Sequence, residues 1–310
     1  MKKICFILIL ACSSLLFVMS GCKKDSSSTE IDLTSDVTYQ TDDQAMFSAE
    51  DDAVSDDING VLETDPLLGG KTNIDTCNVT ITRDSTLLKR FVILTYSGNN
   101  CSGTRTRQGV VKLGMNKNTK WKNAGAEISV EIQNLKITRL RDNKSLVLNG
   151  TKILTNVSGH LLRELITGGV SNIVHTVASS NMSATFDNGT SRQWQIAKQR
   201  TFTYNTGFVI SVTGTATVDG ATNVAVWGTN RFGQSFSTRV INPMVIKADC
   251  DYRIVSGKLL HTKLTRDITV TFGLDASGNP TSCPGSANPY YFKAEWTSLN
   301  GTAYSIIKPY

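Results

Sequence analysis

The chain has few of the residues and motifs that would identify its chemistry directly. Only three of its 310 residues are histidine, and six prolines are too few for a proline-rich rod. The one long apolar run lies within the first twenty residues, which excludes a protein that spans the membrane several times. Wholesale disorder is also excluded, because 40% of the residues are hydrophobic and only 19% are charged.

Familiar catalytic motifs are missing. The sequence has no GxSxG nucleophile motif, no HExxH metal motif, no Walker loop and no GxGxxG phosphate-binding turn. The three histidines, His160, His175 and His261, lie in unrelated segments. We therefore predict no catalytic residue, no cofactor and no metal ligand.

A glycan-acting hydrolase is the enzyme class that we keep as an alternative, because it requires two carboxylates placed about the scissile bond. Beyond residue 70 the sequence offers Glu127, Glu131, Glu164 and Glu295 among few others. Glu127 and Glu131 are four residues apart, which separates their backbones by about 13 Å in a strand. These two carboxylates alone would not form a simple catalytic pair.

The amino terminus has the pattern of an export signal. Lys2 and Lys3 precede an apolar stretch over residues 4–19, which has the length of a secretory signal and is short for a spanning helix. Ser20 and Gly21 come directly before Cys22, and the chain then turns polar. This arrangement resembles a bacterial lipobox. The resemblance implies a signal peptide over residues 1–21, fatty acyl chains such as palmitate on Cys22, and an outer-membrane lipoprotein of the cell envelope that faces the periplasm or the outside.

Four cysteines remain in the mature chain beside the acylated Cys22, namely Cys77, Cys101, Cys250 and Cys283. An even number in an exported protein predicts two disulfides, for which three connectivities can be drawn. In each half of the chain one cysteine begins a predicted hairpin and another follows the return strand. We therefore pair Cys77 with Cys101 and Cys250 with Cys283. Zinc ligation is the competing interpretation, but the sequence has no CxxC pair.

The mature chain divides into three parts by composition. Residues 22–40 are rich in Ser, Thr and Asp and are predicted to be a flexible tether. Residues 41–70 are predicted to hold an acidic amphipathic helix and a linker, because Phe47, Val54, Ile58 and Val61 recur at helical spacing. Residues 71–310 are predicted to form a β body, and the similar surroundings of its two cysteine pairs suggest two related halves.

The β body is predicted from alternation and turns. Ile128, Val130 and Ile132 alternate with polar residues, which is typical of half-buried antiparallel strands. Asn188-Gly189 is the strongest hairpin signal. The fold class is therefore all-β, an antiparallel meander of about twelve to fourteen strands that forms a sandwich or a barrel-like body, with one N-terminal acidic helix.

Charge is divided sharply along the chain. Residues 25–65 contain 13 acidic and no basic residues, whereas residues 66–310 contain 28 basic and 13 acidic residues. We favour the interpretation that the acidic arm packs on the basic body and neutralises part of it. The alternative is that the arm covers a basic face that otherwise binds an anionic partner, such as an acidic glycan or an envelope protein. Nucleic acid is not an expected partner.

One candidate for such a face lies around a tryptophan. Arg192, Trp194, Lys198 and Arg200 are separated by even numbers of residues, so a strand would project all four from one side. A tryptophan among cations can stack on a sugar ring while the charges hold an anionic group. A tryptophan in a β domain is more often a core residue, so a core position for Trp194 stays the alternative. Trp121, which is flanked by lysines, is the better candidate for an exposed aromatic. Trp227 and Trp296 are assigned to the core.

Several segments resemble an uncharacterised family of Bacteroidota outer-envelope lipoproteins. These are residues 95–101, 105–111 and 150–156, Arg192-Gln-Trp194, and the closing segment from Phe272 to Gly301. The resemblance spans most of residues 40–310, but Ser97 replaces the usual glycine of the first segment. It implies an all-β fold and provides no activity or catalytic residue. We therefore expect a membrane-anchored envelope protein that binds a ligand or has a structural role and is not an enzyme.

Overall fold

A computed structural model describes residues 50–310, with gaps at 52–53, 56, 66–67, 69–76, 102, 141, 264–265, 286–287 and 299. The predicted signal peptide, Cys22, the tether and the first part of the predicted helix therefore lie outside the described residues. The described residues belong to one compact unit, which begins at Ala45.

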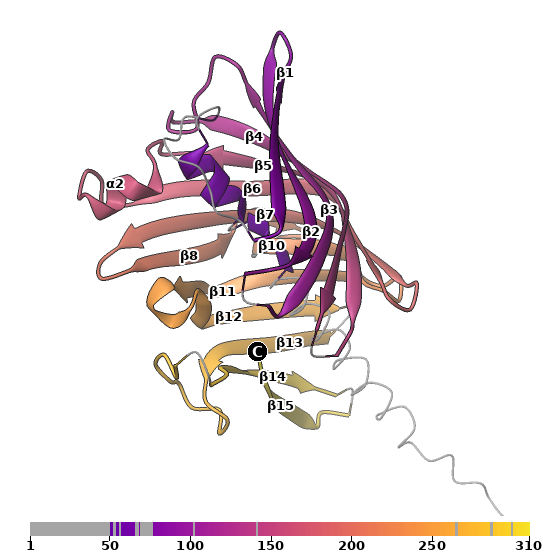
Figure 1. Cartoon of the computed structure of the whole chain (residues 1–310). Coiled ribbons are helices and arrows are strands. Elements are labelled where there is room, and N and C mark those ends of the chain that lie inside the picture. The colour runs from indigo at the N-terminus through magenta and orange to yellow at the C-terminus, as the bar shows by residue number, and fades with distance from the viewer. Residues whose placement is uncertain are drawn as a thin grey trace, which may run out of the picture. The chain divides into compact units, whose positions relative to one another are not determined.

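Fifteen antiparallel strands form one continuous, barrel-like sheet (Figure 1). The first seven are β1 (Val79–Ser85), β2 (Lys89–Asn99), β3 (Arg105–Asn116), β4 (Ala126–Arg139), β5 (Ser145–Asn156), β6 (Ile173–Phe186) and β7 (Ser191–Tyr204). The other eight are β8 (Phe208–Gly214), β9 (Ala216–Val218), β10 (Ala221–Thr229), β11 (Ser235–Lys247), β12 (Arg253–Lys263), β13 (Arg266–Leu274), β14 (Tyr291–Thr297) and β15 (Ala303–Pro309). The all-β class is confirmed, with one sheet and slightly more strands than predicted.

Helices are short within the described part of the chain. The acidic helix is described from residue 50 to residue 64, apart from residues 52, 53 and 56, and we call it the N-terminal helix. Helix α2 (Leu162–Ile166) and the 3-10 turn η1 (Ala248–Cys250) lie in loops of the sheet. None of the helices described is long and apolar enough to cross a membrane.

The strand order follows the sequence closely. Neighbouring strands are consecutive from β1 to β7 and from β10 to β15. Two strands, β8 and β10, lie between β7 and β11. Each of them pairs with both β7 and β11, but along different parts of these strands. Gly214 of β8 lies against Asn223 of β10. A Cβ atom on Gly214 would lie 2.1 Å from the carbonyl oxygen of Asn223, so only glycine fits here without rearrangement.

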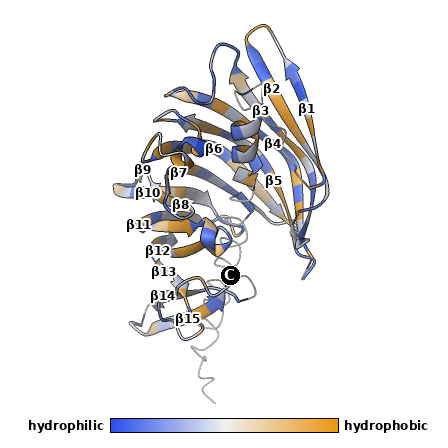
Figure 2. Cartoon of the chain, turned by 60° about the vertical axis from the view of Figure 1, so that its left-hand side comes forward, coloured by the Kyte–Doolittle hydropathy of each residue, from blue (hydrophilic) through white to orange (hydrophobic). Residues whose placement is uncertain are grey.

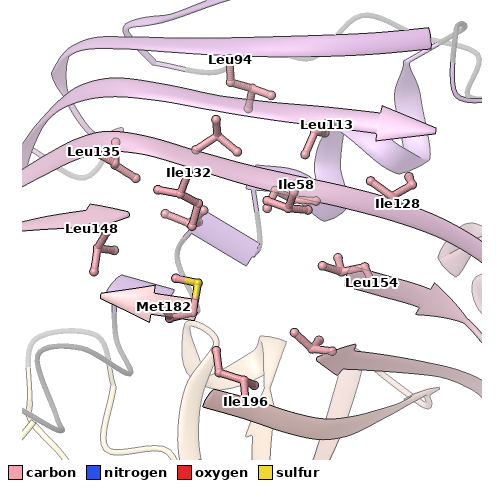
Figure 3. Close-up of a cluster of buried hydrophobic side chains, with 14 of the residues drawn as sticks. Ile58, Leu94, Leu113, Ile128, Ile132, Leu135, Leu148, Leu154, Met182 and Ile196 are labelled. Carbon is pink, nitrogen blue, oxygen red and sulfur yellow. The ribbon is translucent and has the colours of Figure 1, made fainter. Parts of the chain in front are cut away.

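The N-terminal helix lies against the concave side of the sheet, which we call the inner face (Figure 1). Val54, Ile58, Val61 and Leu62 of the helix are fully buried and join one hydrophobic core with inward residues of the sheet. Figure 3 shows Ile58 among leucines and isoleucines of β2 to β5 and β7 and Met182 of β6. Since burial of each such side chain contributes about 1.5–3 kcal/mol, the helix is an integral part of the core.

Both predicted disulfides are formed. Cys77 and Cys101 flank the β1–β2 hairpin with their Cα atoms 5.1 Å apart, and Cys250 and Cys283 flank the β12–β13 hairpin with a Cα separation of 5.2 Å. Each disulfide therefore closes the open end of a hairpin, as the spacing predicted.

Candidate functional site: a charged inner face that holds an acidic helix

Acidic side chains in and just after the N-terminal helix pair with basic side chains of the sheet. The four ion pairs are Glu50–Arg105, Asp51–Lys152, Asp57–Arg107 and Asp65–Arg83, and their cations come from β1, β3 and β5. Residues that are more than 100 positions apart in the sequence thus meet at one surface. This is the packing of the acidic arm on the basic body that the charge division predicts.

The pair Asp51–Lys152 lies deepest. The Lys152 ammonium donates to the Asp51 carboxylate, and both side chains are almost completely buried, with 1% and 2% of their surface exposed. Burial alone would raise the pKa of Asp51, but the charges of Lys152, Lys198 and Arg200 outweigh this effect and lower the pKa. Asp51 is therefore ionised and interacts with several cations at once.

Asp57 anchors the middle of the helix through two strands. Its carboxylate accepts a hydrogen bond of 2.5 Å from the Arg107 guanidinium and one of 3.0 Å from the Tyr96 hydroxyl. The guanidinium also lies over the Tyr96 ring, 4.6 Å from its centroid. Burial and the negative charge of Asp57 raise the pKa of Tyr96, so the phenol stays protonated and acts as a donor.

Glu50 and Glu63 lie at opposite ends of the described helix. Glu50 accepts from Arg105, yet burial raises its pKa more than the neighbouring arginines lower it. Glu63 accepts from the backbone amide of Leu162 at 2.9 Å and so connects the N-terminal helix to α2. The positions of these five carboxylates are thus fixed by contacts within the chain, namely those of Glu50, Asp51, Asp57, Glu63 and Asp65.

The predicted anion patch on β7 is found on the inner face. Arg192, Trp194, Lys198 and Arg200 share one side of the strand, as their spacing predicted. However, Arg192, Trp194 and Arg200 are buried, and Lys198 is half-buried. Arg192 stacks on Phe236 at 4.3 Å, inside the sheet. The burial of Trp194 fits the alternative of a core tryptophan and not an exposed aromatic platform, because this side of β7 faces the hydrophobic core.

Trp121 is also not exposed. Its side chain is fully buried, and its ring contacts His175 with the two centroids 5.0 Å apart. Its backbone carbonyl accepts a hydrogen bond of 2.9 Å from Asn156, which fixes the β3–β4 loop against β5. The flanking lysines Lys120 and Lys122 are exposed, so only the charged part of this prediction describes the surface. Trp296 is buried, as predicted, and Trp227 is half-buried.

Two of the three histidines are buried and neutral. His175 is 3% exposed and lies between Trp121 and Phe202, and His261 is 5% exposed and contacts the Thr238 hydroxyl at 2.9 Å. Burial, assisted by nearby arginines, lowers the pKa of both residues to about 3. Both imidazoles therefore lack a positive charge at neutral pH and serve as packing groups.

The carboxylates considered for glycoside hydrolysis are spread over three elements. Glu127 and Glu131 are exposed on β4. Glu164 lies in the first turn of α2 and contacts the His160 imidazole at 2.8 Å, whereas Glu295 on β14 pairs with Lys293 at 2.6 Å. Glu164 and Glu295 thus have local partners of their own. Within the described part of the chain, no group of three or more His, Cys, Asp or Glu residues is arranged to hold a metal ion.

Sequence reasoning missed Lys152, although the sequence contains a signal for it. In β5, Lys152, Leu154 and Asn156 are two residues apart, so their side chains point to the same face of the sheet. Leu154 and Asn156 are buried on this face, and the alternation therefore predicts that Lys152 is buried as well. A buried lysine requires a carboxylate, and the only long acidic segment of the chain is the arm before residue 66. Which acidic residue of the arm pairs with Lys152 could not be predicted from the sequence, because it depends on how the helix crosses the sheet.

Comparisons of this chain with family models, curated proteins and solved structures found no match in any of the three. The class of the protein is therefore defined by its fold, a single curved antiparallel sheet around an acidic helix.

Proposed function

We propose that the protein is a lipid-anchored, non-enzymatic component of the cell envelope. In this proposal the chain is exported, acylated on Cys22 and held at the outer membrane, where the exposed surface of the sheet binds an envelope partner or ligand. The proposal places it beside the uncharacterised Bacteroidota lipoproteins that its sequence resembles.

The pair of disulfides is the observation that carries the proposal. All four cysteines beyond residue 22 lie in bonds that close a hairpin, and such bonds persist in the periplasm or outside the cell and are reduced in the cytosol. The export signal and the lipobox pattern at residues 1–22 independently point to the same compartment.

The non-enzymatic part of the proposal is supported by how the ionisable groups of the inner face are used. Glu50, Asp51 and Asp57 of the N-terminal helix pair with arginine or lysine, and the two buried histidines are held neutral. Groups that could transfer protons are thus committed to holding the helix and the core.

Fractionation of cells that produce the full chain tests this proposal. The wild type should sediment with outer membranes and resist extraction by carbonate, and its four cysteines should react with a maleimide only after reduction. Cys22→Ala should lose the association that resists carbonate extraction and should keep both disulfides if it is still exported. A wild-type protein found in the cytosol with free thiols would contradict the proposal.

A further inference from the structure

The tip of the β1–β2 hairpin exposes two adjacent leucines. Leu87 is 92% exposed and Leu88 is 79% exposed, the highest values for large hydrophobic residues in the described part of the chain. The tip projects beyond the neighbouring strands and is hydrophobic, as Figure 2 shows. Single apolar residues on a surface are common, but two consecutive leucines at a projecting tip are not needed for a hairpin turn.

A basic loop lies beside this tip. The backbone amide of Lys117, in the β3–β4 loop, donates to the Leu88 carbonyl at 2.9 Å, and its ammonium reaches the Thr86 carbonyl at 3.4 Å. The Arg90 guanidinium donates to the Thr119 carbonyl and fastens the same loop to the hairpin. The leucines and the loop therefore form one surface, which we call the leucine–lysine tip.

The charge of the leucine–lysine tip has one dominant sign. Residues 84–90 and 116–125 contain five cationic side chains and one acidic side chain, Asp84. Four of the cations are exposed lysines, namely Lys89, Lys117, Lys120 and Lys122. Asp84 accepts a hydrogen bond from the amide of Ser85 at the start of the turn.

We propose that the leucine–lysine tip binds an anionic lipid bilayer, with Leu87 and Leu88 inserted among the acyl chains and the lysines against the headgroups. Leucine side chains gain free energy on leaving water, and lysines gain from the negative surface potential of anionic lipids. Neither the pair of leucines nor the lysines alone would give stable attachment, but the two contributions act on the same surface.

This contact goes beyond the proposed lipid anchor and is separate from it. Cys22 lies 28 residues before Glu50, and a chain of that length can span up to about 95 Å. An acylated Cys22 would therefore let the tip reach the bilayer that holds the anchor. Lipidation would raise the local concentration of the tip at the membrane, and the tip would orient the sheet there.

Vesicle sedimentation with the unacylated mature chain, residues 23–310, tests the tip without the anchor. This chain retains every described residue and both disulfides. It should bind phosphatidylcholine vesicles that contain about one third phosphatidylglycerol, and bind pure phosphatidylcholine about tenfold more weakly. L87N/L88N and K117Q/K120Q/K122Q should each reduce binding to the anionic vesicles by about tenfold.

Matched variants distinguish binding through the tip from nonspecific hydrophobic adsorption to vesicles. I166N/I241N removes two apolar residues of α2 and β11 that are 51% and 45% exposed, and it should bind like the wild type. L87W should keep binding, and its fluorescence should shift to the blue when anionic vesicles are added. The thermal unfolding midpoint of L87N/L88N should equal that of the wild type, because neither leucine is buried.

Two outcomes would overturn the proposal. One is a wild-type chain that does not bind anionic vesicles better than neutral ones. The other is an L87N/L88N variant that is folded and binds as tightly as the wild type. Neither outcome would affect the acylation of Cys22, which is tested by its own fractionation experiment.

Discussion

At the scale of single residues, the least expected feature is a lysine in the core. Lys152 is 1% exposed, and its charge is balanced by Asp51 of the N-terminal helix. A buried ion pair gains little overall, because desolvation of the two charges offsets much of their attraction. Its loss is costly when only one partner is removed, since the other charge then stays buried without compensation.

Replacement of Lys152 alone should therefore destabilise the protein strongly. We expect Lys152→Met to lower the free energy of unfolding by about 3–5 kcal/mol, and D51L/K152M to recover most of that loss. Urea unfolding of the oxidised protein at pH 7 measures both values. Lys136→Met, at an exposed position of β4, is the control and should change stability by less than about 0.5 kcal/mol. If Lys152→Met were as stable as the wild type, Asp51 and Lys152 would not form a buried ion pair.

The buried histidines should make the fold sensitive to mild acid. A histidine has a pKa of about 6.5 when unfolded, and burial lowers the pKa of His175 and His261 to about 3 in the folded state. The unfolded chain therefore binds more protons between these pH values, so stability falls as pH decreases from about 6.5 towards 3. At pH 5 each histidine should cost about 2 kcal/mol relative to pH 7.

Denaturation at pH 7 and pH 5 checks this effect. In H175Q/H261Q, the free energy of unfolding should decrease much less between pH 7 and pH 5 than in the wild type. His160→Asn is the matched control, because His160 is 47% exposed and asparagine tolerates its positive φ of 70°. If the double variant and the wild type showed the same loss between pH 7 and pH 5, the histidines would not be the cause.

At the scale of elements, glycines and asparagines at bulges bend the sheet. Gly109 has a φ of 143°, and a Cβ there would lie 2.6 Å from the backbone of Asn134 and Leu135 in β4. Gly150 in β5 repeats this arrangement against Asn181 and Met182 in β6. The strand register shifts near each of these positions, which is the signature of β-bulges that increase local curvature.

Gly150→Ala should be destabilising for two reasons. The φ of 138° strains an L-residue, and the new methyl group would lie 2.7 Å from the Asn181 carbonyl oxygen and 2.9 Å from the Cα atom of Met182. We expect a loss of about 2–4 kcal/mol in urea unfolding. Gly60→Ala should act in the opposite direction and stabilise by about 0.5–1 kcal/mol, because Gly60 is helical with open space around it. If Gly150→Ala left the free energy of unfolding unchanged, β5 and β6 would be able to move apart at this bulge without cost.

The elements themselves could be predicted well from local patterns. Alternation and turn residues predicted an antiparallel meander, and the placement of Cys77 and Cys101 about one hairpin predicted their bond. The choice between sandwich and barrel could not be made, because it depends on where bulges such as Gly109 and Gly150 align across strands. The exposure predicted for Trp121 was wrong, since the charges that flank a residue in the sequence do not show on which face of the sheet it lies. For Trp194 the sequence left the choice between core and surface open.

At the scale of the whole molecule, the acidic arm and the basic sheet are parts of one structure. The helix provides apolar residues to the core and carboxylates to cations of β3 and β5, and Asp65 just after the helix pairs with Arg83 of β1. The division of charge along the sequence therefore reflects how the fold is closed on its inner side. Surface functions then depend on residues outside this contact, such as those of the leucine–lysine tip.

The proposed role of the molecule depends most on its attachment to the envelope through Cys22. Mass spectrometry of the mature N-terminus, on protein purified from membranes of the native host, tests this most directly. The account predicts a first peptide that begins at Cys22 and carries fatty acyl chains on that residue. A mature protein that begins elsewhere, or a Cys22 without lipid, would contradict it.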